Sequence, residues 1–506
     1  MVTAALDVEP RPIAWGGLPP GPRPRARRPL LRALCLLGLA GGLCRAQDAG
    51  LPEKSVNVRD LGAVGDGVAD DTRAIESALR EAQGLPTGRA LYLPAGTYRY
   101  TRNIRVDGVA VHGDGADRTI LVGSDGRHLA WVLTGDSPSI RDLSIRAAKR
   151  PSARDTHDTA VGLEANLARN FSMVRVGVGP VDSAGIMVRR SGGAGGRTAV
   201  VRDCVVRGTL ADGIHITAAS HDIEVSGNRV GDTGDDFIAV VSYRADRGLC
   251  HDISIHDNTV ADQSHGRGIS VVGGTGVSIA SNSIKRSSGA GIYLASEAGY
   301  DTYGDAEVRV LRNRLSDVAT DARLGHGAIL LVGRPSPELL EPALEVKDVW
   351  IEGNSVDGAS RNGLYLGAYA SGVTVIGNSI SNTHACGISV YPRVADISIG
   401  SADPGSPANI VGPCGESGIE VDPAGSRGAL RISGVVFRSL NTRNIGHADA
   451  VRIGPNSGFA TISITGNRLG QPAGHPLTRF IEALSPVNQD AGNTADAQLG
   501  GSLPHP

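Results

Sequence analysis

Residues 213–228, GIHITAASHDIEVSGN, determine how this chain folds. They contain two short stretches in which apolar and polar side chains alternate, the first opened by glycine and the second closed by asparagine. Alternation with a period of two is typical of a β-strand with one buried face. Strands this short cannot bury that face alone, so the segment predicts a unit that its neighbours in the chain complete.

The same unit recurs through the middle of the chain, about every 23 to 36 residues. The opening strands begin at Gly213, Phe237, Gly268, Gly291, Gly363, Gly387 and Gly418, and the closing strands end at Asn228, Asn258, Asn282, Asn313, Asn354 and Asn378. Leucine-rich repeats would show denser leucine, and propeller blades would show four strands per unit. Stacked asparagines can hydrogen-bond to one another. The pattern therefore predicts an all-β, single-stranded, right-handed parallel β-helix with coils about 4.8 Å apart.

The two ends of the repeat region suggest its limits. Asp70-Asp71-Thr72 can cap a helix whose apolar residues Ile75, Ala78, Leu79 and Ala82 lie on one face. Such a helix would cover the first exposed coil. We expect one β-helix domain over residues 47–485, with its N-terminal cap at 56–100, and a loose tail over 486–506.

Composition excludes several classes of protein. The 506 residues include 69 glycines, aromatic residues make up 4%, and the formal net charge is −2. The sequence shows no basic face of the kind that binds nucleic acid. No apolar run reaches the roughly 20 residues of a membrane span. Beyond the leader, the spacing of the cysteines matches no zinc pattern. Cys386 and Cys414 could pair across neighbouring coils or remain buried thiols.

The first 46 residues have the order of an export signal. Four arginines, from Arg23 to Arg28, precede the apolar run 30–43, and Cys44-Arg45-Ala46 could end a cleavage site. Arg27-Arg28 also resembles a twin-arginine address. The sequence therefore predicts export to the periplasm or beyond the cell.

A family resemblance appears in the N-terminal module. The segments 58–67 (VRDLGAVGDG), 70–72 (DDT) and 91–98 (LYLPAGTY) resemble the N-terminal module of the pectate-lyase-like superfamily. The resemblance implies the β-helix fold. It does not by itself choose among hydrolases, lyases, epimerases and tailspikes, which share this module.

A cluster of carboxylates gives the clearest chemical signal. Asp212 stands directly before one opening strand, and Asp235 and Asp236 stand directly before the next. Alignment of the coils places Asp212 and Asp236 at the same turn, about one coil spacing apart. Mutual repulsion should raise at least one pKa in such a group. Glycoside hydrolysis uses that difference, although aspartates in turns also cap backbone amides or bind calcium.

The local strings resemble family 28 glycoside hydrolases, the polygalacturonase family. The motifs are 211–214 (ADGI), 233–240 (TGDDFIAV) and 264–270 (SHGRGIS). The resemblance implies an inverting hydrolase in which Asp235 is the general acid, Asp212 and Asp236 hold the attacking water, and His265 supports the acid. Strict alignment instead places Arg267 at the position of the family's histidine. Gly291-Ile292-Tyr293 replaces the family's uronate-binding Arg-Ile-Lys, so the uronate site is altered.

Side chains around the carboxylates are candidates for binding sugar. Alternation predicts an outward row on successive opening strands: His215, Ala239, Ser270, Tyr293, Ile329, Tyr365, Ser389 and Glu420. Tyrosine rings can act as sugar platforms or simply cover the sheet. Tyr243 and Arg244 could form the opposite wall, with Glu297 above the edge and Arg267 as an anion contact.

Three functions remain open from the sequence. The first is an exported, monomeric polysaccharide hydrolase that uses Asp212, Asp235 and Asp236 with no metal or cofactor. The second is a lyase or C5-epimerase on a uronate polymer, with Arg267 or His265 as base and calcium bound by the carboxylates. The third is a non-catalytic glycan-binding surface protein.

Overall fold

The computed structural model describes residues 55–124, 129–149, 152–155, 160–263, 265–335, 344–470, 477 and 479–495. The chain divides into two compact units, Met1–Leu51 and Pro52–Pro506. All described residues belong to the second unit. The predicted export signal, residues 1–46, lies outside the described part.

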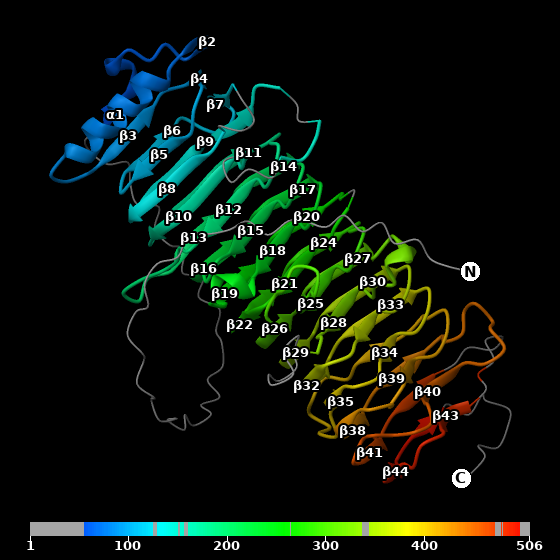
Figure 1. Cartoon of the computed structure of the whole chain (residues 1–506). Helices are drawn as coiled ribbons and strands as arrows, with labels where there is room; N and C mark the ends of the chain where they lie inside the picture. The colour runs from blue at the N-terminus through cyan, green and yellow to red at the C-terminus, as the bar shows by residue number, and fades with distance from the viewer. Residues whose placement is uncertain are drawn as a thin grey trace, which may run out of the picture. The chain divides into compact units, whose positions relative to one another are not determined.

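The second unit is a right-handed parallel β-helix. Within the described residues its strands form a 14-strand sheet and a 31-strand sheet (Figure 1). The 14-strand sheet contains the opening strands of the repeat, most of which follow a glycine: β5 (Ile104–Asp107), β8 (Trp131–Asp136), β10 (Leu163–Arg169), β12 (Ile186–Arg189), β15 (Ile214–Thr217), β18 (Ile238–Val241), β21 (Ile269–Val272), β25 (Ile292–Ala295), β28 (Ile329–Val332), β31 (Leu364–Leu366), β34 (Ile388–Val390), β37 (Ile419–Val421), β40 (Asp449–Ile453) and β43 (Arg479–Ala483).

The 31-strand sheet contains two stacks that are joined where long strands bend. One stack contains β1 (Val56–Asn57), β3 (Ala90–Leu93), β6 (Ala110–Gly113), β9 (Ser139–Ala147), β11 (Ser172–Val178), β13 (Ala199–Arg202), β16 (His221–Ser226), β19 (Cys250–His256), β22 (Gly274–Thr275), β23 (Ser278–Ala280), β26 (Asp305–Leu311), β29 (Val346–Glu352), β32 (Ala370–Ile376), β35 (Ala395–Gly400), β38 (Arg427–Ser433), β41 (Thr461–Thr465) and β44 (Gln489–Ala491). The other contains β2 (Asp66–Asp70), β4 (Gly96–Tyr100), β7 (Thr119–Gly123), β14 (Val205–Thr209), β17 (Arg229–Thr233), β20 (Thr259–Ala261), β24 (Ser283–Lys285), β27 (Arg314–Val318), β30 (Ser355–Ala359), β33 (Ser379–Thr383), β36 (Ile410–Val411), β39 (Val436–Arg438), β42 (Arg468–Gly470) and β45 (Thr494–Ala495).

Inward side chains from all three stacks form one continuous core of Val, Ile, Leu and a few aromatic residues. Each coil therefore buries the alternate residues that the sequence pattern predicts. In the described segments, three short 3-10 helices lie between strands: η1 (Val58–Leu61), η3 (Arg244–Asp246) and η4 (Ala322–Leu324).

The predicted capping helix is confirmed as α1 (Thr72–Gly84). Its buried residues include Ile75, Ala78, Leu79 and Ala82. The Asp70 carboxylate accepts a hydrogen bond from the Thr72 backbone N–H at 3.0 Å. The Asp71 carboxylate binds the loop before the helix instead, accepting from the backbone N–H groups of Val64 and Gly65.

The asparagine ladder is also confirmed. From Asn228 to Asn354, each asparagine donates its backbone N–H and its side-chain amide to the amide oxygen of the next asparagine, at 2.9–3.0 Å. Asn378 extends the ladder to Asn409. These bonds satisfy buried polar groups at every turn, which is why asparagine recurs there.

The coils continue beyond the predicted end of the domain. The prediction of a loose tail from residue 486 is wrong for its first part, because β44 and β45 pair in parallel with β41 and β42. Asn493 accepts from the Asn467 backbone N–H at 2.9 Å and so repeats the ladder once more. The exposed side chains of β44 hid this coil from the apolar pattern.

The cysteines of the described part are buried free thiols: Cys204, Cys250, Cys386 and Cys414. The thiol of Cys386 faces Glu420 at 3.4 Å. Among the described residues, no helix is long and apolar enough to cross a membrane.

Candidate functional site

The register of β15 and β18 brings three aspartates together. Ile214 pairs with Ile238, so Asp212 and Asp236 occupy the same turn on adjacent coils. Gly213 lies between them in space, and its backbone N–H donates to the Asp236 carbonyl at 2.9 Å. A Cβ at Gly213 would lie 2.6 Å from the Phe237 carbonyl oxygen, so glycine permits this close approach. One oxygen from each of Asp212, Asp235 and Asp236 lies within 4.8 Å of the others.

Asp236 is the most buried member of this group, which we call the aspartate trio. Its side chain is 5% exposed, and burial raises its pKa to about 7, with further increases from the charges of Asp212 and Asp235. The charge of Arg267 and a hydrogen bond from the Ser270 hydroxyl lower it in part. The expected rise of one pKa in the trio is therefore present. The trio contains a carboxyl group that titrates near neutral pH.

Asp212 forms a pair with a histidine on the strand that it precedes. Its Oδ2 lies 2.7 Å from Nδ1 of His215, and both side chains are about nine-tenths buried. An imidazole held in this way by a carboxylate has a fixed orientation. His215, predicted as a substrate contact, is thus a direct neighbour of the trio.

Asp235 is the most exposed member, with 25% of its side chain open to solvent. Its Oδ2 accepts from Arg154 at 2.9 Å. Arg154 comes from the segment before β10, and no pattern in the sequence signalled its role. The side-chain amide of Gln263 donates to the backbone carbonyls of Asp235 and Arg267 and so connects the turns of the two adjacent coils.

Arg267 occupies the turn position that strict alignment gave it. Its backbone N–H donates to Asp236 Oδ1 at 2.6 Å, and its guanidinium lies between that carboxylate and Glu297, which it reaches at 2.9 Å. The guanidinium also lies 4.6 Å above the centre of the Tyr293 ring. Although burial alone would lower it, the charges of Asp236 and Glu297 raise the pKa of Arg267 above its ordinary value. The carboxylates therefore favour the protonated guanidinium of Arg267 in this arrangement.

Tyr293 and its neighbours form a packed wall beside the trio. Tyr293 is 8% exposed, and its ring stacks on His326 with the ring centres 5.6 Å apart. Burial and the charge of Arg267 lower the pKa of His326 to about 4. His326 stands three residues before Ile329, the turn position that Asp235 has before Ile238, and it was missed because the sequence alignment of this coil was off by one residue.

The remaining predicted site residues lie at different distances from the trio. Tyr243 is half-buried, and its pKa is raised by burial and by the charge of Asp212, which places it beside the site. Arg244 faces Asp301 at 3.8 Å. His265 is exposed and directly precedes Gly266, whose backbone packs against Asp235 and Asp236, and no hydrogen bond from its side chain to the trio is seen among the described residues. Strict alignment explains this result, because Arg267 occupies the turn.

The outward row is present, with one correction. Its members pair in register along the 14-strand sheet: His215, Ala239, Ser270, Tyr293, Leu330, Tyr365, Ser389 and Glu420. The prediction of Ile329 is wrong by one residue. Ile329 is fully buried in the core, since it pairs with Ile292 rather than with Tyr293.

The site carries an excess of negative groups. Four carboxyl groups, those of the trio and Glu297, face two guanidinium groups, those of Arg154 and Arg267. Both guanidinium groups are already engaged by carboxylates. An anionic sugar would meet repulsion here unless a cation joined it.

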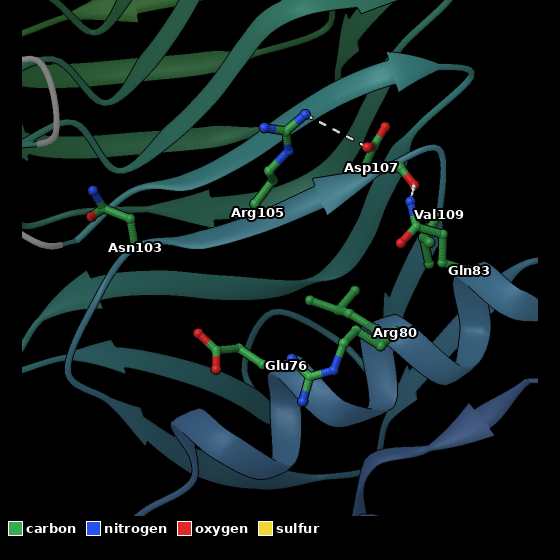
Figure 2. Close-up of a pocket in the computed structure, with 8 residues that line it drawn as sticks. Glu76, Arg80, Gln83, Asn103, Arg105, Asp107 and Val109 are labelled. Atoms are coloured by element: carbon green, nitrogen blue, oxygen red, sulfur yellow. Dashed lines mark hydrogen bonds and ion pairs between the residues drawn. The ribbon is translucent and has the colours of Figure 1, made fainter.

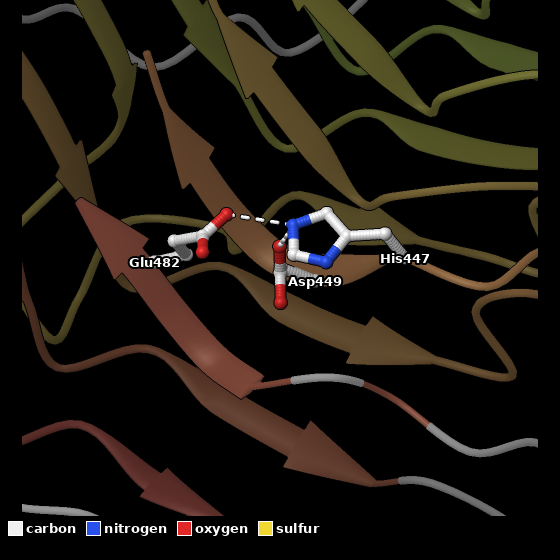
Figure 3. A group of neighbouring side chains, drawn as sticks. All are labelled: His447, Asp449 and Glu482. Atoms are coloured by element: carbon white, nitrogen blue, oxygen red, sulfur yellow. Dashed lines mark hydrogen bonds and ion pairs between the residues drawn. The ribbon is translucent and has the colours of Figure 1, made fainter. Parts of the chain in front are cut away.

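A second group with acidic side chains lies at the C-terminal end of the same sheet. His447 Nε2 lies 2.7 Å from Glu482 Oε2 and 3.4 Å from Asp449 Oδ2 (Figure 3). Glu482 also faces Arg452 at 3.3 Å and Arg479 at 3.8 Å. We call this group the histidine cluster. Its ion pairs connect β40 to β43, so it ties the last coils together.

A small pocket lies at the opposite end, between α1 and β5. Its volume is about 260 Å³, and Glu76, Arg80, Gln83 and Arg105 are among the residues that line it (Figure 2). Gln83 donates to the backbone carbonyl of Asp107. This pocket belongs to the packing of the cap and lies far along the sheet from the trio.

Comparison with known proteins places the chain among polysaccharide-related β-helices. Residues 55–293, just under half of the chain, match the family described as rhamnogalacturonase A/epimerase, pectate lyase-like. The chain is 19% identical to the catalytic unit of a GH87 alpha-1,3-glucanase from Streptomyces thermodiastaticus strain HF3-3. That match has a TM-score of 0.51 and covers 88% of this chain and 70% of the other.

Shorter segments resemble mannuronan C5-epimerases of Azotobacter vinelandii. The identity to AlgE4 is 35% over 105 residues, 18% of this chain and 19% of AlgE4. The identity to AlgE5 is 56% over 43 residues, 8% of this chain and 4% of AlgE5. The matched segments thus span less than a fifth of these relatives. The predicted pectate-lyase-like β-helix is confirmed, whereas the resemblance to family 28 is only approximate.

Proposed function

We propose that this chain is a glycoside hydrolase that cleaves a neutral polysaccharide at the aspartate trio. The observation that carries the proposal is the trio itself: three carboxyl groups on adjacent coils, one of which has its pKa raised to about 7. Glycosidic cleavage needs one protonated carboxyl group for the leaving oxygen and one ionised group to activate water or attack the sugar. A trio that retains a proton near neutral pH can supply both.

The exposures and contacts suggest a role for each carboxyl group. Asp235 is the most exposed and is therefore the one that can reach the leaving oxygen. Asp236, whose pKa burial raises to about 7, keeps a proton in the cluster near neutral pH. Asp212, oriented by His215, is placed to accept a proton from water.

The excess of carboxylates favours a neutral substrate. Both arginines at the site are engaged by the trio and Glu297, so neither is available to hold a uronate carboxylate. The glucanase with the same fold is an alpha-1,3-glucanase, an enzyme of a neutral polymer. The resemblance implies an inverting reaction, and this outcome stays a prediction. The spacing does not add support to it, since the nearest oxygens of the trio lie closer together than the ~6.5–9.5 Å typical of inverting pairs.

A uronate C5-epimerase or lyase is the second candidate. It is supported by the similarity to mannuronan C5-epimerases and by the ability of three converging carboxylates to bind a divalent cation. Such a cation would offset the negative charge that a uronate meets. His215, which Asp212 holds beside the trio, joins Arg267 and His265 as a candidate base for this reaction.

A product assay on purified protein separates the candidates. Neutral polysaccharides and uronate polymers are tested with and without a chelator. A hydrolase yields new reducing ends on a neutral polymer and is insensitive to the chelator. A lyase yields unsaturated ends that absorb in the ultraviolet, and an epimerase changes sugar configuration without new chain ends. Either of the last two results would refute the hydrolase proposal.

We also propose that the chain is exported, because a polymer outside the cell can be met only there. The support is the arginine-rich, apolar order of residues 1–46. Mass spectrometry of protein recovered outside the cytoplasm should show that this segment has been removed. An intact Met1 on that protein would contradict export by this signal.

A further inference from the structure

The histidine cluster brings three atoms of metal-ligand type to one point near the C-terminal end of the 14-strand sheet. His447 Nε2 lies 2.7 Å from Glu482 Oε2 and 3.4 Å from Asp449 Oδ2, and in Figure 3 both dashed lines end on this same nitrogen. All three atoms lie within 4.8 Å of one another. The two carboxylate side chains are at least nine-tenths buried, whereas the imidazole is 37% exposed. Two shielded carboxylates therefore converge on one partly exposed nitrogen.

One of these buried oxygens lacks a hydrogen-bond donor. Asp449 is fully buried, and among the described residues no group donates a hydrogen bond to its Oδ2. Its Oδ1 accepts from the backbone N–H of Arg479 at 2.9 Å, which holds the carboxylate with Oδ2 toward the imidazole. His447 Nε2 carries at most one proton, and its hydrogen bond is made with Glu482. Because an unpaired buried oxygen is costly, this arrangement points to a further group that binds Asp449 Oδ2.

A divalent cation would satisfy all three atoms at once, because it takes a lone pair from each of them. With bonds of about 2.0–2.2 Å, two ligand atoms of a tetrahedral zinc site lie roughly 3.3–3.6 Å apart. His447 Nε2 and Asp449 Oδ2 already have this spacing, and Glu482 Oε2 needs to move away by a fraction of an ångström. One imidazole nitrogen with two carboxylate oxygens suits Zn²⁺ better than Ca²⁺ or Mg²⁺, which prefer oxygen ligands alone.

Two arginines beside Glu482 are compatible with a bound cation. Arg452 Nε lies 3.3 Å from Glu482 Oε2, and an amino nitrogen of Arg479 lies 3.8 Å from Oε1. A carboxylate oxygen has two lone pairs, so Oε2 can bind an ion with one and accept from Arg452 with the other. Carboxylates that bind metals are commonly held by a second hydrogen bond of this kind. The arginine side chains are 33% and 52% exposed, so solvent screens their repulsion of the ion.

A second histidine between carboxylates shows what distinguishes His447. His256 places its Nδ1 2.8 Å from Asp257 and its Nε2 3.7 Å from Glu224. These carboxylates contact different nitrogens of the ring, so one ion cannot replace both contacts. Their side chains are 67% and 31% exposed, and water can satisfy them. Only convergence on one nitrogen, together with burial, makes a histidine–carboxylate group a candidate metal site.

We propose that the histidine cluster is a zinc site, in which His447 Nε2, Asp449 Oδ2 and Glu482 Oε2 bind the ion and water completes its coordination. The ion joins β40 to β43. Among the described strands β43 is an edge of the 14-strand sheet, since it pairs there with β40 alone. An edge strand opens more easily than a strand with two neighbours, so the ion stabilises the end of the β-helix. The site does not depend on which reaction the trio catalyses.

The test is a calorimetric titration of Zn²⁺ into the purified chain after a chelator has been used to remove bound metal. We expect one strongly bound ion per chain. His447→Gln and Asp449→Asn each remove a ligand and should weaken binding at least about 100-fold, more than the loss of a group that only supports a ligand. His256→Gln is the matched control and should bind Zn²⁺ like the wild type. Asp235→Asn should do the same, which separates this site from a cation held by the trio.

Hydrogen exchange tests the place of the ion. At free Zn²⁺ about 100-fold above the dissociation constant, opening of β43 should become about 100-fold rarer, and its amides should exchange correspondingly more slowly. Because His447 is partly exposed, His447→Gln should fold, and its titration decides the question even if Asp449→Asn does not fold. The proposal is overturned if the wild type binds no Zn²⁺ or if His447→Gln binds it as tightly as the wild type. Equal weakening in His256→Gln, or loss of binding in Asp235→Asn, would also overturn it.

Discussion

The aspartate trio and the histidine cluster occupy equivalent positions on one sheet. Asp212, Asp236 and Asp449 each stand two residues before a core residue that pairs in register: Ile214, Ile238 and Val451. At the trio, carboxyl groups outnumber the arginines that face them. At the histidine cluster, His447, Arg452 and Arg479 surround two carboxylates. The same turn therefore carries an excess of carboxyl groups on one pair of coils and closely paired charges on the other.

The largest expected effect comes from neutralising the trio. Asp236→Asn removes the proton held near pH 7 and should lower turnover about 10²- to 10⁴-fold, the range of acid–base catalysis. The shape of the side chain is kept, so the protein should fold. Reducing-end release by the folded variant measures the effect. Unchanged turnover would show that Asp236 takes no part in the reaction. The trio would then not differ in function from the equivalent turn at Asp449.

The next effect is on stability as a function of pH. Because burial raises the folded-state pKa of Asp236 to about 7, its contribution to stability is fully present below pH ~4 and is lost as pH rises through 7. Between the unfolded-state pKa near 4 and the folded-state pKa near 7, the lost contribution amounts to about 4 kcal/mol of unfolding free energy. Denaturant unfolding at several pH values should show a smaller decline in Asp236→Asn than in the wild type. The same slope in both proteins would contradict a raised pKa at Asp236.

At the histidine cluster, we expect a substitution to lower stability without changing activity. Glu482→Gln removes the carboxylate that faces His447, Arg452 and Arg479, and it should lower the free energy of unfolding by about 1–3 kcal/mol. Turnover per folded molecule should not change. A loss of turnover with unchanged stability would show that this cluster acts in the reaction.

The smallest effect concerns the hydroxyl group beside Asp236. The Ser270 hydroxyl donates to the Asp236 carboxylate, which favours the ionised form. Ser270→Ala should therefore raise the pKa of Asp236 and move the alkaline limb of the pH–rate profile upward by about one pH unit. The Ser463→Ala variant, on the other sheet, is the control. A downward shift would mean that the hydroxyl group stabilises the protonated form.

The fold could be predicted from the sequence because every coil repeats the same physical demand. A glycine before most opening strands relieves close contacts with the next coil, and an asparagine after most closing strands satisfies buried hydrogen bonds, both at fixed positions in the repeat. The trio followed from the same alignment of the coils. The last coil of the β-helix was missed because the side chains of β44 are exposed and do not follow the apolar pattern.

The counter-charges could not be predicted in the same way. Arg154 comes from a segment outside the aligned strands, and its contact with Asp235 depends on how that segment folds back. His326 occupies the same turn position as Asp235, three residues before its strand's first core residue, but the one-residue error in aligning Ile329 hid it. His265 was favoured by a motif, whereas the register placed Arg267 at the turn. Alignment of the coils therefore finds residues within the repeat, while partners from loops require the structure.

The most direct test is the turnover of folded Asp235→Asn measured beside folded Glu482→Gln on a neutral polysaccharide that the wild type cleaves. The account predicts a loss of about 10²- to 10⁴-fold for Asp235→Asn and wild-type turnover for Glu482→Gln. Wild-type turnover in Asp235→Asn would contradict the assignment of the trio as the catalytic site.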